Sequence, residues 1–175
     1  MAKEYEFHVF QPITTDQYQE SFYKAIGKNW ALITSEKDGK VNAMTASWGG
    51  IGVLWGKDVV FVFVRKSRFT KECIDASGVF SLSFLDHERY SREYKFMGSV
   101  SGRDEDKLAG ARLHAAREKG IPYIDEASTV IMCTTLFKQE LLPEGFTVAG
   151  LDKKFYPDGD DHILYVGEVI KICAR

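Results

Sequence analysis

The chain has 175 residues and nearly balanced charge, with 23 lysines and arginines against 25 aspartates and glutamates. This balance argues against a nucleic-acid-binding surface, and the length predicts a single domain over residues 1–175. The longest apolar run, residues 59–64, is far shorter than the ~20 residues that span a membrane. The first residues show no signal-peptide pattern, and the three cysteines have neither disulfide nor metal-site spacing, so we expect a cytoplasmic protein.

The first half of the chain divides into short segments separated by turn residues. In chain order, the patterns predict a strand or arm over residues 5–10, a helix over 15–27, strands over 30–35 and 41–48, a glycine-rich turn over 49–52, and a buried strand over 59–65. Asp38 and Gly39 are typical of the turn of a β-hairpin.

The second half continues in the same way. It predicts a helix over residues 70–76 that stops at Ser77 and Gly78, a strand over 79–85, a charged helix capped by Asp86, a short helix over 104–108, an extended segment over 113–124, and strands over 128–142 and 162–172. Gly167, in the middle of the last strand, indicates a bulge or a close approach of another group. Strands outnumber helices and follow one another as hairpins, which favours a mainly β fold: an antiparallel barrel with peripheral helices.

A cluster of basic and hydroxyl side chains follows the buried strand of residues 59–65. It contains Arg65, Ser67, Arg68 and Thr70, at the point where a helix is expected to begin. Guanidinium groups, hydroxyls and the unpaired N–H groups of a helix start together bind phosphate well. The alternative is a solvated loop after a buried strand. The preceding strand carries the small polar residues Thr45 and Ser47, so the unit suggests a site for a phosphorylated planar cofactor.

Three other candidate features have weaker support. A dinucleotide-binding fingerprint starting at Gly50 would need glycine at position 55, which is Trp55. His162 follows Asp160 and Asp161 and could act as a proton donor or a hydrogen-bond partner, although a solvent-exposed turn histidine is the simpler interpretation. Cys73 follows the basic cluster and could have a lowered pKa, but packing is its expected role.

Four segments together resemble the flavin reductase-like family, most closely its flavoredoxin-type branch. They are residues 30–50, 61–74, 98–107 and 161–169. The resemblance implies the FMN-binding split β-barrel fold, with Greek-key antiparallel strands. It also implies a homodimer that binds one FMN per subunit near the dimer interface.

By position, the resemblance assigns residues to each part of FMN. Met44, Thr45, Ala46, Ser47 and Trp48 would line the isoalloxazine ring; Arg65, Ser67, Arg68 and Thr70 would hold the ribityl chain and phosphate; Ser99 and Lys107 would complete the site. His162 falls at the position associated with the nicotinamide side of the flavin. Asp160 is an extra acidic residue relative to the family's pattern there, and Met97 replaces a cysteine found in several relatives.

These assignments predict an FMN-dependent oxidoreductase that passes hydride from NADH or NADPH to FMN. A flavin carries the redox chemistry itself, which agrees with the lack of a catalytic triad or a metal-ligand set in the sequence. The main alternative is a flavoredoxin-type electron carrier that exchanges electrons with a partner protein and has no nicotinamide reaction of its own. A third is a barrel that binds another phosphate ester without redox chemistry.

Overall fold

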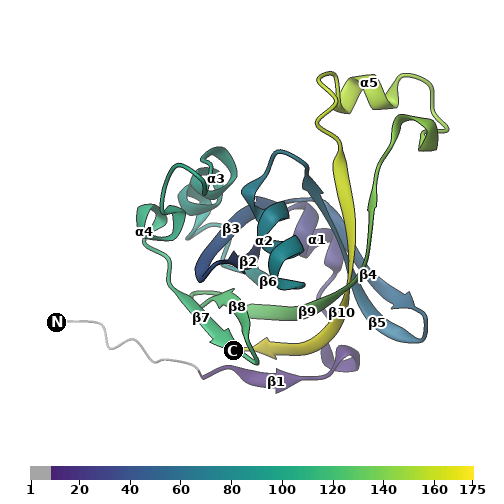
Figure 1. Cartoon of the computed structure of the whole chain (residues 1–175). Helices are drawn as coiled ribbons and strands as arrows, with labels where there is room; N and C mark the ends of the chain where they lie inside the picture. The colour runs from purple at the N-terminus through teal and green to yellow at the C-terminus, as the bar shows by residue number, and fades with distance from the viewer. Residues whose placement is uncertain (1–8) are drawn as a thin grey trace.

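A curved antiparallel sheet forms the centre of the structure (Figure 1). The computed structural model describes residues 9–175. The strands are β1 (Gln11–Ile13), β2 (Ala31–Lys37), β3 (Lys40–Ala46), β4 (Gly49–Leu54), β5 (Lys57–Arg65), β6 (Val79–Phe84), β7 (Ala115–Glu118), β8 (Ile121–Ile124), β9 (Thr129–Glu140) and β10 (His162–Ala174). Their order in the large sheet is β3-β2-β6-β9-β10-β5-β4, and β1 pairs with the end of β10.

Helices lie at the periphery of this sheet, as the sequence predicts (Figure 1). They are α1 (Phe22–Gly27), α2 (Phe69–Ser77), α3 (Ser91–Ser99), α4 (Lys107–Ala111) and α5 (Leu151–Phe155), with 3₁₀ turns η1 (Thr15–Gln17) and η2 (Pro143–Gly145). Strands β7 and β8 form a separate hairpin. The segment between β9 and β10 projects from the sheet and carries η2 and α5. The fold is therefore mainly β, with an antiparallel barrel and helices around it.

The hydrophobic core lies on both faces of the sheet because neighbouring strand residues point in opposite directions. Ile33 and Ile131 belong to a cluster with Phe80 and Tyr165. Their neighbours Leu32 and Met132 belong to a second cluster, which includes Tyr94 and Met97 of α3 and Ile124 of β8. The second cluster fixes α3 beside β2 and β3, and so fixes one wall of the site described below.

The predicted irregularity at Gly167 is confirmed. The pairing of β10 with β9 shifts register between Val166 and Gly167. A Cβ atom at Gly167 would lie 2.5 Å from the Phe80 ring and 2.8 Å from the Cβ of Cys133. Only glycine lets β10 pass this closely over the core.

Several local predictions were wrong. Residues 49–52 belong to strand β4 and not to a turn, because Gly49 lets the backbone approach Ile26 and Phe61 at distances that a side chain would block. The predicted helix over residues 15–27 is two short elements, η1 and α1. Asp86 accepts a hydrogen bond from the Arg89 backbone in a turn, and α3 begins only at Ser91.

Other differences concern the bounds and the identity of short segments. The short helix predicted over residues 104–108 is α4, which begins at Lys107 because Asp106 caps it. The extended segment over 113–124 is the β7–β8 hairpin, and α5 was not predicted at all. Most of the segment predicted as a first strand or arm, residues 5–10, lies outside the described residues, and β1 begins after it.

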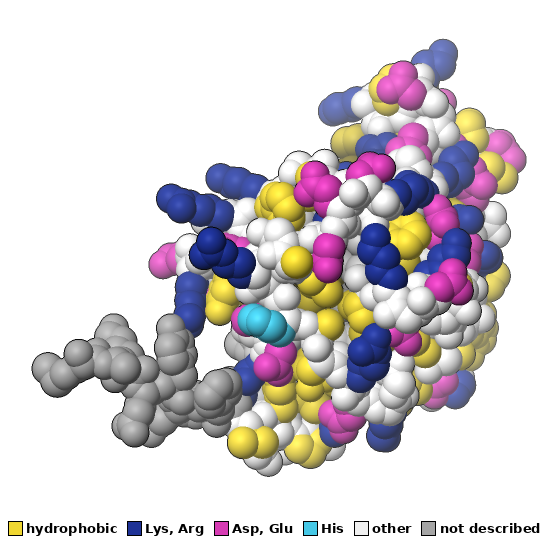
Figure 2. All heavy atoms as spheres, turned by 60° about the vertical axis from the view of Figure 1, so that its left-hand side comes forward, with side chains coloured by type: hydrophobic (Ala, Val, Ile, Leu, Met, Phe, Trp, Pro, Cys, Tyr) yellow, Lys and Arg dark blue, Asp and Glu magenta, His cyan; other side chains and the backbone are white. Residues whose placement is uncertain are grey.

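The surface carries mixed charges where it can be viewed in Figure 2. Basic and acidic side chains are interspersed on that face, in agreement with the near-balanced sequence charge. Among residues 9–175, the helices are all too short and too polar to cross a bilayer.

Candidate functional site

Two adjoining cavities collect the residues that the sequence singled out. The corner cavity, about 280 Å³, lies where β5 leads into α2, and the edge cavity, about 170 Å³, lies beside β3. Both are lined by Met44, Arg65 and Arg68, so they form one continuous groove. Ser67, Thr70, Ser99 and Lys107 also line the corner cavity, and Thr45, Ala46, Ser47, Trp48 and His162 line the edge cavity. All the predicted site residues are therefore brought together.

Helix α2 presents its N-terminus to the corner cavity. Arg68 is the N-cap residue, and its side chain does not cap the helix. Its guanidinium also makes no hydrogen bond or ion pair with any residue in the described part of the chain. The positive end of the helix and an uncompensated guanidinium thus face the same space, an arrangement that attracts anions.

Lys107 adds a second uncompensated cation. Its side chain is buried, with 4% exposure, and its Nζ donates to the carbonyl of Met97. No carboxylate pairs with it among residues 9–175. Burial and, to a lesser extent, the positive charge of Arg68 lower the pKa of Lys107 to about 8. A buried ammonium without an acidic partner is unfavourable unless something else supplies the negative charge.

Thr70, in the first turn of α2, also lines the corner cavity. Asn42 on β3 donates a hydrogen bond from Nδ2 to Thr70 Oγ1, at 2.8 Å, and both residues are buried. Because Thr70 accepts this bond, its own hydroxyl hydrogen is available to a ligand. A Cβ atom at Gly102 would lie 2.0 Å from Asn42 Oδ1, so glycine is required there. Sequence reasoning missed both Asn42 and Gly102 as parts of the site.

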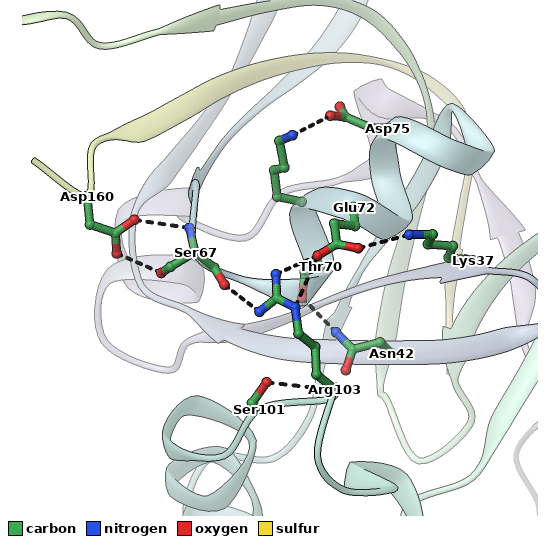
Figure 3. A network of polar contacts seen from close by, with 10 residues as sticks. Lys37, Asn42, Ser67, Thr70, Glu72, Asp75, Ser101, Arg103 and Asp160 are labelled. Atoms are coloured by element: carbon green, nitrogen blue, oxygen red, sulfur yellow. Dashed lines mark hydrogen bonds and ion pairs between the residues drawn. The ribbon is translucent and has the colours of Figure 1, made fainter.

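Arg103 also lines the corner cavity, but its charge is already paired (Figure 3). Its Nη1 donates to the Ser67 carbonyl at 2.7 Å, while Nε and Nη2 donate to Glu72. The Glu72 carboxylate also accepts from Lys37, and the hydrogen bonds from Lys37 and Arg103 lower its pKa. Arg103 therefore braces the turn at Ser67 against α2. It lies in the segment of residues 98–107, in which the family resemblance assigned only Ser99 and Lys107 to the site.

Asp160 occupies the opposite side of the Ser67 turn (Figure 3). Its Oδ1 accepts from the Ser67 backbone N–H at 3.0 Å, and its Oδ2 accepts from the Ser67 hydroxyl at 2.7 Å. The backbone carbonyl of Asp160 accepts from Arg65 Nη1 at 2.8 Å. The sequence marked Asp160 only as an extra acidic residue and gave no indication of this contact.

The edge cavity is bordered by the backbone of β3. Within residues 9–175, β3 ends the sheet and pairs with β2 only. Alternate peptide groups of such an edge strand point away from the sheet and are open to a ligand. The Thr45 hydroxyl donates to the Tyr94 carbonyl of α3, which leaves the backbone as the hydrogen-bonding surface. Trp48, 45% exposed, adds a flat apolar side.

His162 closes the edge cavity at the start of β10. It is buried, its Nδ1 is 2.9 Å from the Tyr156 hydroxyl, and its ring lies 5.1 Å from that of Trp48. Burial and, to a lesser extent, the positive charge of Arg65 lower the pKa of His162 to about 4. The ring is therefore neutral at neutral pH. Of the two roles considered for His162, this environment favours a hydrogen-bond partner over a cationic proton donor, and it does not fit a solvent-exposed turn histidine.

The cysteines are packing residues. Cys73, Cys133 and Cys173 are buried and free. Burial raises the pKa of Cys73 to about 11, so the alternative of an activated thiol beside the basic cluster was wrong. No group of His, Cys, Asp and Glu side chains in residues 9–175 is arranged to hold a metal ion.

The family is decided by a match to a known domain. Residues 23–175 match the flavin reductase like domain. The chain belongs to the flavin reductase-like family. The resemblance in the sequence is thereby confirmed, and the groove lies in segments that carry it.

Solved structures of flavin reductase-like and related proteins share the fold. An FMN-binding domain of a flavin reductases-like enzyme from Shewanella baltica is 19% identical, with a TM-score of 0.69, covering 95% of this chain and 77% of that one. A flavoredoxin from Methanosarcina acetivorans is 23% identical, with a TM-score of 0.68 and coverages of 84% and 68%. An FMN-binding protein from Thermus thermophilus is 20% identical, with a TM-score of 0.65 and coverages of 94% and 82%. The comparison with curated proteins found no match.

Proposed function

We propose that the protein binds FMN and acts as an oxidoreductase that takes hydride from NADH or NADPH. The observation that carries this proposal is the pair of uncompensated cations, Arg68 and Lys107, beside the N-terminus of α2. Lys107 is buried and has no acidic partner in the described chain, so an anionic ligand would stabilise its charge. A phosphate ester fits this need, because the Thr70 hydroxyl and the first N–H groups of the helix supply further donors.

The edge cavity supports a flat, hydrogen-bonding ring next to that phosphate. The outer peptide groups of β3 around Met44 to Ala46 offer donors and acceptors in a row, and Trp48 offers an apolar side. Bound FMN would supply the redox chemistry, accepting a hydride from reduced nicotinamide and passing two electrons to an acceptor. The chain itself needs to bind the ring, orient it and adjust its electrostatics.

His162 is suited to positioning the nicotinamide. Its Nδ1 is engaged by Tyr156, while Nε2 makes no hydrogen bond to residues 9–175. The neutral ring can therefore offer Nε2 to a ligand in the edge cavity. We propose that this contact orients the hydride donor and does not supply a proton.

We also propose that the protein forms a homodimer. Ile51, Val53 and Trp55 on and after β4 are 42%, 72% and 62% exposed, and Phe137 packs against Trp55. A contiguous set of exposed apolar side chains is typical of an interaction surface. Size-exclusion chromatography with light scattering should give twice the chain mass, and a monomer at micromolar concentration would contradict this part of the proposal.

The test of the main proposal is flavin binding followed by anaerobic reduction. The purified protein, alone or after adding FMN, should show a flavin spectrum, and NADH or NADPH should bleach it in the absence of oxygen. A colourless protein that does not bind added FMN would contradict the proposal. Retention of another phosphate ester in place of a flavin would instead support a ligand-binding barrel without redox chemistry.

A second candidate is an electron carrier that binds FMN but does not react with nicotinamide. It is favoured by the packing of residues 155 and 156 against two aromatic rings that line the edge cavity. Phe155 packs on Trp48 with ring centroids 5.8 Å apart, and Tyr156 packs on His162. The Trp48 and His162 rings therefore already contact aromatic side chains of the chain itself, which leaves less of their surface for a nicotinamide ring. FMN that dithionite reduces, and that NADH and NADPH leave oxidised, would establish this candidate, with a redox partner protein as the electron source.

A further inference from the structure

The hydrogen-bond donors of Ser67, in the corner cavity, already bind a negative group from the chain itself. The Asp160 carboxylate accepts hydrogen bonds from both donors of Ser67, the backbone N–H and the hydroxyl (Figure 3). Ser67 is one of the residues that the family resemblance assigns to the ribityl chain and phosphate of the flavin. The two oxygens of Asp160 thus take positions that two oxygens of a phosphate would need.

The position of Asp160 is fixed by the same corner of the fold. Arg65 Nη1 donates to the Asp160 carbonyl, and the backbone N–H of Lys66 donates to the carbonyl of Asp161. These two bonds hold the chain just before β10 against the end of β5. The carboxylate is therefore built into the corner cavity, which Asp160 lines together with Arg68.

A phosphate and this carboxylate exclude each other at Ser67. Each Ser67 donor has one hydrogen, so neither can be given in full to both oxygen anions. In addition, two negative groups close together repel each other in a partly buried site. A ligand with a phosphate must displace the carboxylate or bind beside it, whereas a ligand without a phosphate need do neither.

We propose that Asp160 is a specificity-determining residue that competes with the phosphate of the ligand and reduces the preference for FMN over riboflavin. This inference rests on the proposed function, because it assumes that the groove binds a flavin. It also gives a role to the extra acidic residue that departs from the family's pattern. Arg68 and Lys107 still favour the phosphate, and Asp160 offsets part of their effect.

The test compares the affinities for FMN and riboflavin in four proteins: the wild type, Asp160→Asn, Asp160→Ala and the control Asp158→Asn. Quenching of flavin fluorescence gives the dissociation constants. Asp160→Ala should bind FMN about tenfold more tightly or better, the scale of a hydrogen bond to a charged group. Asp160→Asn removes the charge but keeps an acceptor, so its gain should be smaller. Riboflavin affinity should stay within about twofold in all four proteins. Asp158→Asn makes the same charge change two residues away, at an exposed position, and should match the wild type.

A double-mutant cycle adds a direct test of the shared donor. Ser67→Ala should weaken FMN binding more in the Asp160→Ala background than in the wild type, because the hydroxyl is released to the phosphate only there. Thermal melting of each variant confirms that it is folded, and the near-isosteric Asp160→Asn serves if Asp160→Ala does not fold.

The outcomes separate this inference from the proposed function. Unchanged or weaker FMN binding in both Asp160 variants, or equal gains for FMN and riboflavin, would overturn the competition while leaving FMN binding intact. Binding of FMN by the Asp160 variants alone would support it strongly. Failure of all the proteins to bind either flavin would instead remove the proposed function, and this inference with it.

Discussion

The two cavities of the groove are built in different ways. The corner cavity is lined mainly by a short stretch, residues 65–70, and by a second segment, residues 99–107, with Asn42, Met44 and Asp160 completing it. The edge cavity consists largely of the backbone of β3, closed by Trp48 and by His162 from the far end of the chain. Binding an anion requires particular residue types, whereas an exposed strand edge offers peptide groups whatever its sequence.

The two cavities also differ in their electrostatics: the corner is positively charged, whereas the edge contains a neutral histidine. The corner has cations that lack acidic partners in the described chain, and its buried Lys107 has a lowered pKa. The edge has a histidine that is neutral at neutral pH. We therefore expect the corner to determine affinity and the edge to determine reactivity, and each prediction below tests one side of this division.

Replacing Arg68 by alanine should have the largest effect on FMN binding. Arg68 lines both cavities and makes no side-chain polar contact in the described chain, so its charge is available to the ligand. Loss of a hydrogen bond to a charged group costs ~1.5–3 kcal/mol, or about a 10- to 150-fold rise in the dissociation constant. Titration of flavin fluorescence measures this. Arg92→Ala, at an exposed position of α3, is the control, and equal FMN affinity in both variants would contradict the site assignment.

Gly102→Ala should destabilise the corner without removing any contact group. The new Cβ would lie 2.0 Å from Asn42 Oδ1, and Asn42 is buried and bound to Thr70. Such overpacking typically lowers the free energy of unfolding by about 1–3 kcal/mol. Urea unfolding of the apo protein measures the change. Gly145→Ala is the matched control, because nothing lies within 4 Å of its Cβ position, and an unchanged midpoint for Gly102→Ala would show that the loop moves aside easily.

The corner cavity could be predicted largely from local sequence. Arg65, Ser67, Arg68 and Thr70 lie within one turn between a strand and a helix, so their spacing alone places them together. The sequence could not predict which of the cations lack a carboxylate partner in the folded chain. Arg103 is paired with Glu72, thirty-one residues away, and only the fold determines that pairing.

The edge cavity and the residues that close it depend on long-range strand pairing. His162 lies opposite Arg65 because β10 pairs with β5, a register that the separate strands do not reveal. The glycines of residues 49–52 were misassigned to a turn for a similar reason. Gly49 is required because Ile26 and the Phe61 backbone approach its Cα too closely for a side chain, and those contacts are made only in the folded barrel.

Lys107 should make FMN affinity depend on pH. Burial lowers its pKa from the ordinary lysine value to about 8. As pH rises from 7 to about 9.5 the ammonium loses its charge, so FMN affinity should fall by about tenfold, the scale of one charge-assisted interaction. In Lys107→Met the affinity should be lower at pH 7 and should change less with pH. Parallel pH profiles in the two proteins would exclude Lys107 from anion binding.

The same titration affects stability with the opposite sign. Between about pH 8 and 10.5 the unfolded chain binds more protons at Lys107 than the folded chain does. The contribution of this group to the free energy of unfolding therefore rises with pH through that range. Chemical unfolding of apo wild type and Lys107→Met across this range isolates the contribution, which should be absent from the variant.

His162→Gln should have the smallest effect, and it should change only the rate of nicotinamide oxidation. The neutral ring of His162 contributes at most a hydrogen bond between uncharged groups, worth ~0.5–1.5 kcal/mol, so nicotinamide oxidation should slow by about two- to tenfold. FMN affinity should stay within about twofold because the corner determines it. Stopped-flow reduction of the FMN-loaded protein by NADH and NADPH measures the first quantity, and fluorescence titration measures the second.

The pH behaviour of His162 separates its two roles. Burial lowers its pKa in the folded chain to about 4, from an ordinary value of 6.5. The unfolded chain therefore binds more protons between these two pH values, and stability falls as pH drops through that range. The reduction rate, in contrast, should show no step near pH 6.5. Such a step that disappears in His162→Gln would mean that a proton on His162 takes part in turnover. In that case the edge cavity would contribute acid–base chemistry as well as orientation, and the division between affinity at the corner and orientation at the edge would have to be redrawn.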